Sequence, residues 1–188
     1  MACCHSMHLS HHKQSMAQPP TVVVLGCGNV LLGDDGFGPA VIEQLLQSGL
    51  PESVLALDVG TSIREHLLDF LMLPCSRPQL LIVVDAGAGG CPGQVRQCRP
   101  DELPAAKIHD FSLHQFPTVN LLAELQAETG IEVALLLAEA AVIPEQVAPG
   151  LSPPMRAAVL EACARIARLT ASRAVSFTTE STAEATTP

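Results

Sequence analysis

Residues 21–38 read TVVVLGCGNVLLGDDGFG, an apolar run that breaks at glycine and leads into two adjacent acids, Asp34 and Asp35. A second apolar run, residues 80–84, also ends in an acid, Asp85. In open α/β sheets, ligands bind outside the carboxyl ends of the strands. Two strands that each deliver a carboxylate to that edge therefore predict a site for a cation or a proton.

Strand patterns alternate with helix patterns between residues 21 and 171. Unbroken apolar runs indicate strands buried on both faces, and apolar residues spaced three and four apart indicate helices. The expected strands are 21–25, 53–59, 80–84, 94–99 and 132–137, and the expected helices are 37–47, 63–72, 117–129 and 153–169. This order predicts a single α/β domain, a three-layer sandwich whose mostly parallel twisted sheet has helices on both faces. The polar residues 94–99 are expected to form an antiparallel edge strand.

Both ends of the chain lack hydrophobic periodicity. Residues 1–20 are rich in His, Ser and Gln, which is typical of a disordered leader, and His- and Cys-rich tracts of this kind also bind metals in some proteins. Met16 is an alternative start, because the folding signals begin only at residue 21. Residues 172–188, rich in Thr, Ser and Ala, are expected to form a disordered tail.

Composition excludes several classes of protein. The formal net charge of −9 argues against binding to nucleic acid or to an anionic membrane. No apolar run approaches the roughly 18 residues of a membrane span, and the start lacks the apolar stretch of a secretory signal, so we expect a cytoplasmic protein. The seven cysteines show no CxxC spacing, which indicates free thiols rather than disulfides or a zinc ribbon.

The turn after the first strand invites comparison with a dinucleotide site. Gly26 and Gly28 match the start of a GxGxxG fingerprint, but Leu31 stands in place of the third glycine. Asp58, at the end of the second strand, favours this interpretation because an acid there holds a ribose hydroxyl. The two acids that follow the turn oppose it, since their charges would face a pyrophosphate at a helix N-terminus. A nucleotide-binding oxidoreductase remains an alternative.

A cation fits the same geometry better. Asp35 and Asp85 come close together if their strands are neighbours, as a doubly wound order makes them. The alternatives are that Asp34 caps the following helix and that Asp85 caps backbone N–H groups. His114 lies in a loop before a helix, where it is either a third metal ligand or an ordinary surface histidine. Two carboxylates and one imidazole from separate loops leave coordination positions open, as a metal-dependent site requires.

The sequence carries no nucleophile signature of the GxSxG type. Cys27 lies in the first turn, where it is expected to be a small residue in close packing. A catalytic pairing of Cys27 with His114 is the alternative.

Residues 25–38 (LGCGNVLLGDDGFG), 81–86 (LIVVDA) with 92–94 (PGQ), and 112–115 (SLHQ) are arranged in a recognisable order and spacing. Together they resemble the nickel–iron hydrogenase maturation proteases, over about residues 21–170. Residues 58–64 and 110–118 are most similar to the branch that serves deazaflavin-reducing hydrogenases.

The resemblance implies an endopeptidase that removes a C-terminal peptide from the hydrogenase large-subunit precursor after nickel insertion. By their positions in the motifs, Asp35, Asp85 and His114 are the implied metal-contacting residues, with a possible general base among them. Asn29 and Gly36 belong to the first motif and shape its turn. Nickel then arrives with the substrate, and no tightly bound cofactor is expected. We expect a monomer with no nucleic-acid or membrane partner; a maturation factor that checks nickel without cutting is the remaining alternative.

Overall fold

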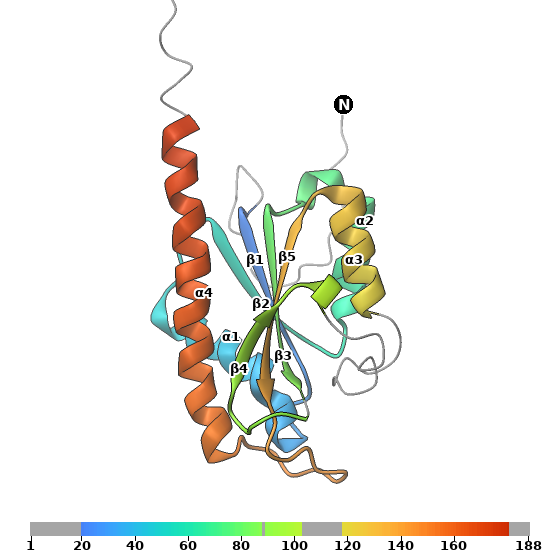
Figure 1. Cartoon of the computed structure of the whole chain (residues 1–188), viewed down its shortest axis with the longest axis vertical. Helices are drawn as coiled ribbons and strands as arrows, with labels where there is room; N and C mark the ends of the chain where they lie inside the picture. Colours follow the sequence, from blue (N-terminus) through green and yellow to red (C-terminus); the bar gives the residue numbers. More distant parts are fainter. Residues whose placement is uncertain (1–19, 88, 103–117, 181–188) are drawn as a thin grey trace, which may run out of the picture.

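The computed structural model describes residues 20–87, 89–102 and 118–180 (Figure 1). In chain order the strands and α-helices are β1 (Val22–Cys27), α1 (Phe37–Ser48), β2 (Val54–Gly60), α2 (Ile63–Met72), β3 (Leu80–Gly87), β4 (Val95–Cys98), α3 (Thr118–Thr129), β5 (Glu132–Glu139) and α4 (Pro153–Glu180). Three short 3-10 turns are added to these: η1 (Gly33–Gly36), η2 (Pro74–Ser76) and η3 (Pro100–Glu102). The expected alternation of strands and helices is confirmed.

The five strands form one sheet in the order β2-β1-β3-β5-β4. The pairs β1–β2, β1–β3 and β3–β5 are parallel, and β4 runs antiparallel to β5 at the edge. The predicted architecture is therefore confirmed, including the antiparallel edge strand. Because β1 and β3 are neighbours, the carboxyl ends of the two acid-bearing segments meet at one edge of the sheet.

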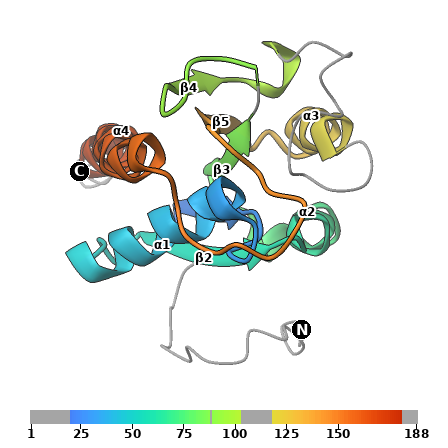
Figure 2. The same cartoon turned by 90° about the horizontal axis from the view of Figure 1, so that it is seen from below.

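Helices cover both faces of the sheet (Figure 2). The packing of α1 and α4 closes one apolar core, and that of α2 and α3 closes the other. All residues of β1 and β3 are buried as a result, which explains why these strands are continuously hydrophobic. Among the described strands, β2 and β4 alternate buried with more exposed positions, as edge strands do.

Helix α1 lies unusually close to the strands beneath its first turn. A Cβ atom on Gly38 would sit 2.2 Å from the Cys27 carbonyl oxygen and 2.7 Å from that of Val84. A Cβ on Gly26 would meet the Gly38 carbonyl oxygen at 2.5 Å. Glycine at these positions lets backbone touch backbone, so the turn between β1 and α1 sits tightly against the sheet edge.

Three elements run further than their sequence patterns indicate. Strand β3 continues through Asp85 to Gly87, and β5 continues to Glu139, because the two strands pair along their full lengths. Asp85 therefore lies within its strand rather than in a loop after it. Helix α4 continues to Glu180, past residue 169 where the helical pattern of the sequence ends. Once the first turns of a helix are packed, each further residue adds a hydrogen bond at little cost.

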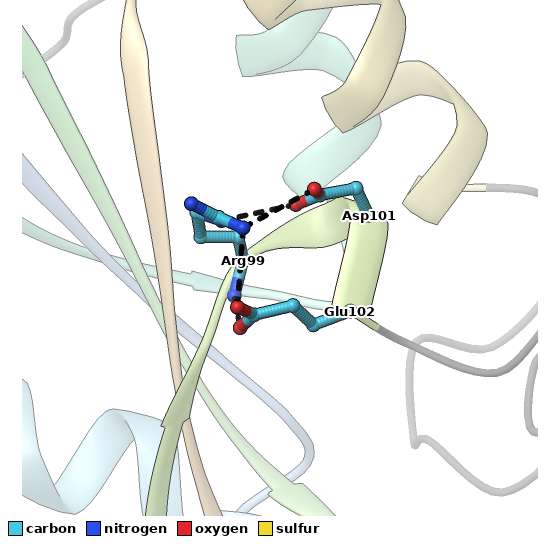
Figure 3. A network of polar contacts seen from close by, with 3 residues as sticks. All are labelled: Arg99, Asp101 and Glu102. Atoms are coloured by element: carbon cyan, nitrogen blue, oxygen red, sulfur yellow. Dashed lines mark hydrogen bonds and ion pairs between the residues drawn. The ribbon is translucent and has the colours of Figure 1, made fainter.

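The edge strand β4 leads into η3, where Arg99 pairs with Asp101 and Glu102 (Figure 3). These side chains are largely exposed, so the cluster contributes little to stability. The expected leader lies outside the described residues apart from residue 20, and so do residues 181–188 of the expected tail. Across the described ranges, no helix combines the length and hydropathy required to cross a membrane.

Candidate active site

Asp35 lies in η1, directly after the turn that follows β1, and is fully buried. Its Oδ2 accepts a 2.8 Å hydrogen bond from the backbone N–H of Asn29. Its Oδ1 is buried and has no hydrogen-bond partner among residues 20–87, 89–102 and 118–180. Buried carboxylate oxygens are normally satisfied, so an oxygen left open in this way suits a ligand that arrives from outside.

The turn that holds Asp35 depends on Gly28. This residue has φ +125°, and a Cβ on it would lie 1.8 Å from the Asp35 carbonyl oxygen. Its N–H donates to the Gly60 carbonyl at the end of β2, at 3.0 Å. Only glycine satisfies both the positive φ and the close approach, so Gly28 fixes the position of Asp35 against the sheet edge.

Asp85 lies near the end of β3 and is fully buried. Its Oδ1 accepts the backbone N–H of Ala86 at 2.8 Å, so it makes the kind of backbone contact that the capping alternative required. The register pairs Asp85 with Leu137 of β5 on one side, while Val84 pairs with Gly26 of β1 on the other. Asp85 is thus at the same sheet edge as the turn that carries Asp35.

The pKa of the Cys27 thiol reflects both its burial and the negative charges at this edge of the sheet. Burial raises the pKa of the Cys27 thiol well above its usual value, and the negative charges of Asp85, Asp58 and Asp35 raise it further. A thiol held protonated in this way is a poor nucleophile, which argues against a Cys27–His114 catalytic pair.

Asp34 connects two loops, a role different from the expected helix cap. Its Oδ2 accepts the N–H groups of Ala141 and Val142 at 2.8 and 3.0 Å, and its Oδ1 accepts that of Ser152 at 2.7 Å. Gly36, not Asp34, is the N-cap of α1. Burial alone would raise the pKa of Asp34, but these backbone hydrogen bonds outweigh it and hold the pKa below its usual value.

Glu139 is a buried acid that the sequence analysis missed. Its Oε1 pairs with Nε of Arg96 at 2.8 Å, and its Oε2 accepts the N–H of Gly90 at 3.0 Å. Because Gly87 and Glu139 are paired in the sheet, these contacts tie the segment after Asp85 to the end of β5. The signal was the same as for Asp85, an acid that ends an apolar run, but the strand was expected to end at residue 137.

The third predicted ligand, His114, lies outside the described residues, as does His109. Within the described ranges, no group of three or more His, Cys, Asp or Glu side chains is placed to hold a metal ion. The structure therefore brings Asp35 and Asp85 to one sheet edge, and their joining with His114 in one metal site stays a prediction.

The fold and the buried carboxylates at the carboxyl edge place the chain among α/β proteins that work at this edge of a parallel sheet. The model of one such family, described as hydrogenase maturation protease, matches residues 39–169. The chain belongs to the hydrogenase maturation protease family, and it is a peptide hydrolase. The resemblance seen in its motifs is confirmed, and the dinucleotide interpretation is not supported.

Two curated relatives illustrate the match. The hydrogenase 2 maturation protease of Escherichia coli is 35% identical over 73% of this chain and 83% of its own length. The coenzyme F420 hydrogenase subunit delta of Methanothermobacter thermautotrophicus is 31% identical over 73% of this chain and 87% of its own length.

Solved structures agree on the fold. The hydrogenase-maturating endopeptidase HybD of E. coli is 30% identical, with a TM-score of 0.57, and the match covers 80% of this chain and 93% of that one. A maturation protease of Thermococcus kodakarensis gives a TM-score of 0.66 over 81% of this chain and 93% of that one. At 22% identity, this second match supports the fold alone.

Proposed function

We propose that this endopeptidase removes the C-terminal peptide of a nickel–iron hydrogenase large-subunit precursor after nickel has been inserted. In this proposal, Asp35, Asp85 and His114 recognise the nickel that the precursor carries. The observation that carries the proposal is the buried Oδ1 of Asp35, which lacks a partner among the described residues at the sheet edge it shares with Asp85.

The residues at this edge have the chemistry that recognition of a bound nickel ion requires. Carboxylates and imidazole bind divalent first-row metals, and one imidazole with two carboxylates makes a site of modest affinity. Such a site engages nickel that is already held by the client and releases it after the cut. The precursor's metal is then a substrate feature, and the protease needs no tightly bound cofactor of its own.

Cleavage needs a polarised carbonyl and an activated water. A metal ion beside the scissile bond supplies the first as a Lewis acid, and a carboxylate supplies the second as a general base. Asp35, with one oxygen held by the Asn29 N–H and the other without a partner among the described residues, is suited to either role. The raised pKa of Cys27 makes this thiol a poor nucleophile, and the proposal assigns the attack to water.

Cleavage of a defined precursor tests this proposal. The chain is mixed with a nickel-loaded large-subunit precursor, and loss of the C-terminal peptide is followed by mass spectrometry. We expect cutting by the wild-type chain, and none by His114→Ala with its fold intact. His66→Ala is the matched control, because His66 lies on α2, outside the turn and the strand that carry Asp35 and Asp85. Cutting by His114→Ala at the normal rate would refute the ligand assignment, and nickel-dependent binding without cutting would indicate a checking factor.

A further inference from the structure

Strand β4 forms the outer edge of the sheet, next to β5. Among the described residues it has no strand neighbour on its other side. The Glu139 N–H of β5 donates to the Gln94 carbonyl at 3.0 Å, and in an antiparallel ladder the residues that bond to the neighbouring strand alternate with residues that do not. The register therefore leaves the N–H and C=O groups of Val95 and Gln97 pointing away from β5. Such groups at a sheet edge are a template for one more strand.

A groove of about 300 Å³ lies beside this edge, between β4 and α4. Figure 2 shows α4 running alongside the edge of the sheet that ends in β4. The Val95 side chain is buried in the core that α4 closes, and side chains two positions apart on a strand share one face. Gln97 is therefore on the α4 face of the edge, and a chain added to β4 places every second side chain over the groove. The lining residues are Gln97, Glu161, Arg165, Arg168 and Leu169.

Two arginines make the groove positive. Arg165 is paired with Glu161, the distance from its Nε to the Glu161 Oε1 being 3.1 Å. Arg168 is exposed and makes no hydrogen bond or ion pair within residues 20–87, 89–102 and 118–180. With one carboxylate against two guanidinium groups, the groove has one positive charge in excess. Guanidinium groups bind carboxylates through paired hydrogen bonds, so the groove suits an acidic side chain.

The charge of α4 is opposite to that of the whole chain. The formal net charge of the protein is −9, whereas the α4 sequence has two glutamates and four arginines, at positions 156, 165, 168 and 173. A nucleic acid or an anionic membrane would meet the negative field of the whole molecule, but a short acidic peptide meets the helix alone. A second copy of the chain would bring the same arginines to the contact, and like charges oppose such an interface.

The groove is remote from the candidate active site. Arg168 is fifteen positions after Pro153, the first residue of α4, which corresponds to about 22 Å along the helix axis. The start of α4 is the end near the active site, because the Ser152 N–H donates to Asp34. An occupant of the groove therefore leaves the carboxyl edge of the sheet accessible to the client.

We propose that the outer edge of β4 and the groove beside α4 bind an extended acidic segment of a partner polypeptide other than the client. The segment is added to the sheet as a further strand. Its backbone pairs with Val95 and Gln97, which supplies affinity, and its carboxylates pair with Arg165 and Arg168, which supplies specificity. The inference does not depend on the proposed function, because no residue of the groove belongs to the candidate active site.

Fluorescence anisotropy with a labelled peptide of alternating glutamate and valine tests the charge of the occupant. A peptide of alternating lysine and valine is the control probe. We expect the wild-type chain to bind the glutamate peptide at least about tenfold more tightly, with added salt weakening the binding. Arg168→Glu should weaken it about tenfold or more, and Glu161→Gln should strengthen it by freeing Arg165. Arg64→Glu is the matched control, an exposed arginine of α2 outside the groove.

The same assay tests the added strand. Gln97→Pro removes the outward N–H and leaves the ladder with β5 in place, as proline does at an edge strand. We expect it to weaken peptide binding about tenfold or more, whereas Gln97→Ala, which keeps the N–H, should bind nearly as the wild type does. Thermal unfolding verifies that each variant is folded. Gln97→Asp replaces a proline variant that is not, and its carboxylate should repel the acidic peptide.

Equal affinity in Arg168→Glu and Arg64→Glu, or in Gln97→Pro and Gln97→Ala, would overturn the assignment. Displacement of the peptide by free glutamate at the same concentration would also overturn it and indicate a site for a small anion. A higher KM for the nickel-loaded precursor in Arg168→Glu would assign the groove to the client. A wild-type dimer in light scattering that Gln97→Pro converts to a monomer would assign the edge to a second copy.

Discussion

Replacement of Asp34 by asparagine tests the connection between the two loops at the active-site edge. Asp34 is fully buried and accepts three backbone N–H groups. An asparagine keeps one carbonyl oxygen, so at best it retains the two bonds at the Oδ2 position in a weaker, uncharged form. The side-chain NH2 group of the asparagine then faces the Ser152 N–H. Both groups are donors, so no hydrogen bond forms there.

The expected loss follows from these contacts. Changing a charge-assisted hydrogen bond into a neutral one costs about 1 kcal/mol, and this applies twice. Losing the third bond, with its N–H left buried, costs about 1–3 kcal/mol more. Asp34→Asn should therefore lower the free energy of unfolding by about 3–5 kcal/mol at neutral pH. Asp69→Asn on the exposed side of α2 is the control, with an expected change within about 0.5 kcal/mol.

Urea denaturation at several pH values measures the loss of unfolding free energy in Asp34→Asn and the direction in which that loss changes with pH. Folding lowers the pKa of Asp34. Its ionised carboxylate therefore contributes fully to the stability of the fold above the pKa of the unfolded state, about 3.9, and this contribution is lost as the pH falls through the lower pKa of the folded state. The difference in unfolding free energy between wild type and Asp34→Asn should therefore disappear in strong acid. A difference below about 1 kcal/mol at pH 7 would refute the assigned role of these hydrogen bonds.

Three further predictions concern residues around the site. Gly28→Ala should destabilise the fold by about 3 kcal/mol or more, since its Cβ meets the Asp35 carbonyl, whereas Gly130→Ala, also at positive φ but in open space, should cost only about 1–2 kcal/mol in the same denaturation assay. Glu139→Ala should lower the free energy of unfolding by about 1–3 kcal/mol because it leaves Arg96 and the Gly90 N–H without their acceptor; an unchanged midpoint would contradict this. Cys27 should resist iodoacetamide in the native protein while the exposed cysteines react, and Cys27→Ala should still cut the precursor.

Much of the fold was predictable because its periodic signals are strong. The continuous apolar runs of β1 and β3 follow from burial on both faces, and Pro74 and Gly130 mark the ends of helices that the structure confirms. The ends of β3, β5 and α4 were not predictable in the same way. Strand pairing across the sheet extends β3 and β5 past the point where their local pattern stops, and this contact is not visible in one segment alone. Helix α4 continues because a helix that has already formed adds further residues at little cost.

The site was predictable only in part. The acids Asp35 and Asp85 were found because each follows an apolar run of the sequence, and topology then brings both to one edge. The role of Asp34 was missed because its partners, at residues 141, 142 and 152, are more than a hundred positions away in the chain. Glu139 was missed because its strand was expected to end at residue 137, and because its partner Arg96 lies 43 positions away in the antiparallel edge strand.

A crystal structure of this protein soaked in nickel or cadmium would show whether Asp35, Asp85 and His114 form one metal site. We predict one ion bound by carboxylate oxygens of Asp35 and Asp85 and by a ring nitrogen of His114, at about 2.0–2.4 Å, with at least one coordination position open to the client. An ion bound elsewhere, or the three side chains widely separated with no ion between them, would contradict it.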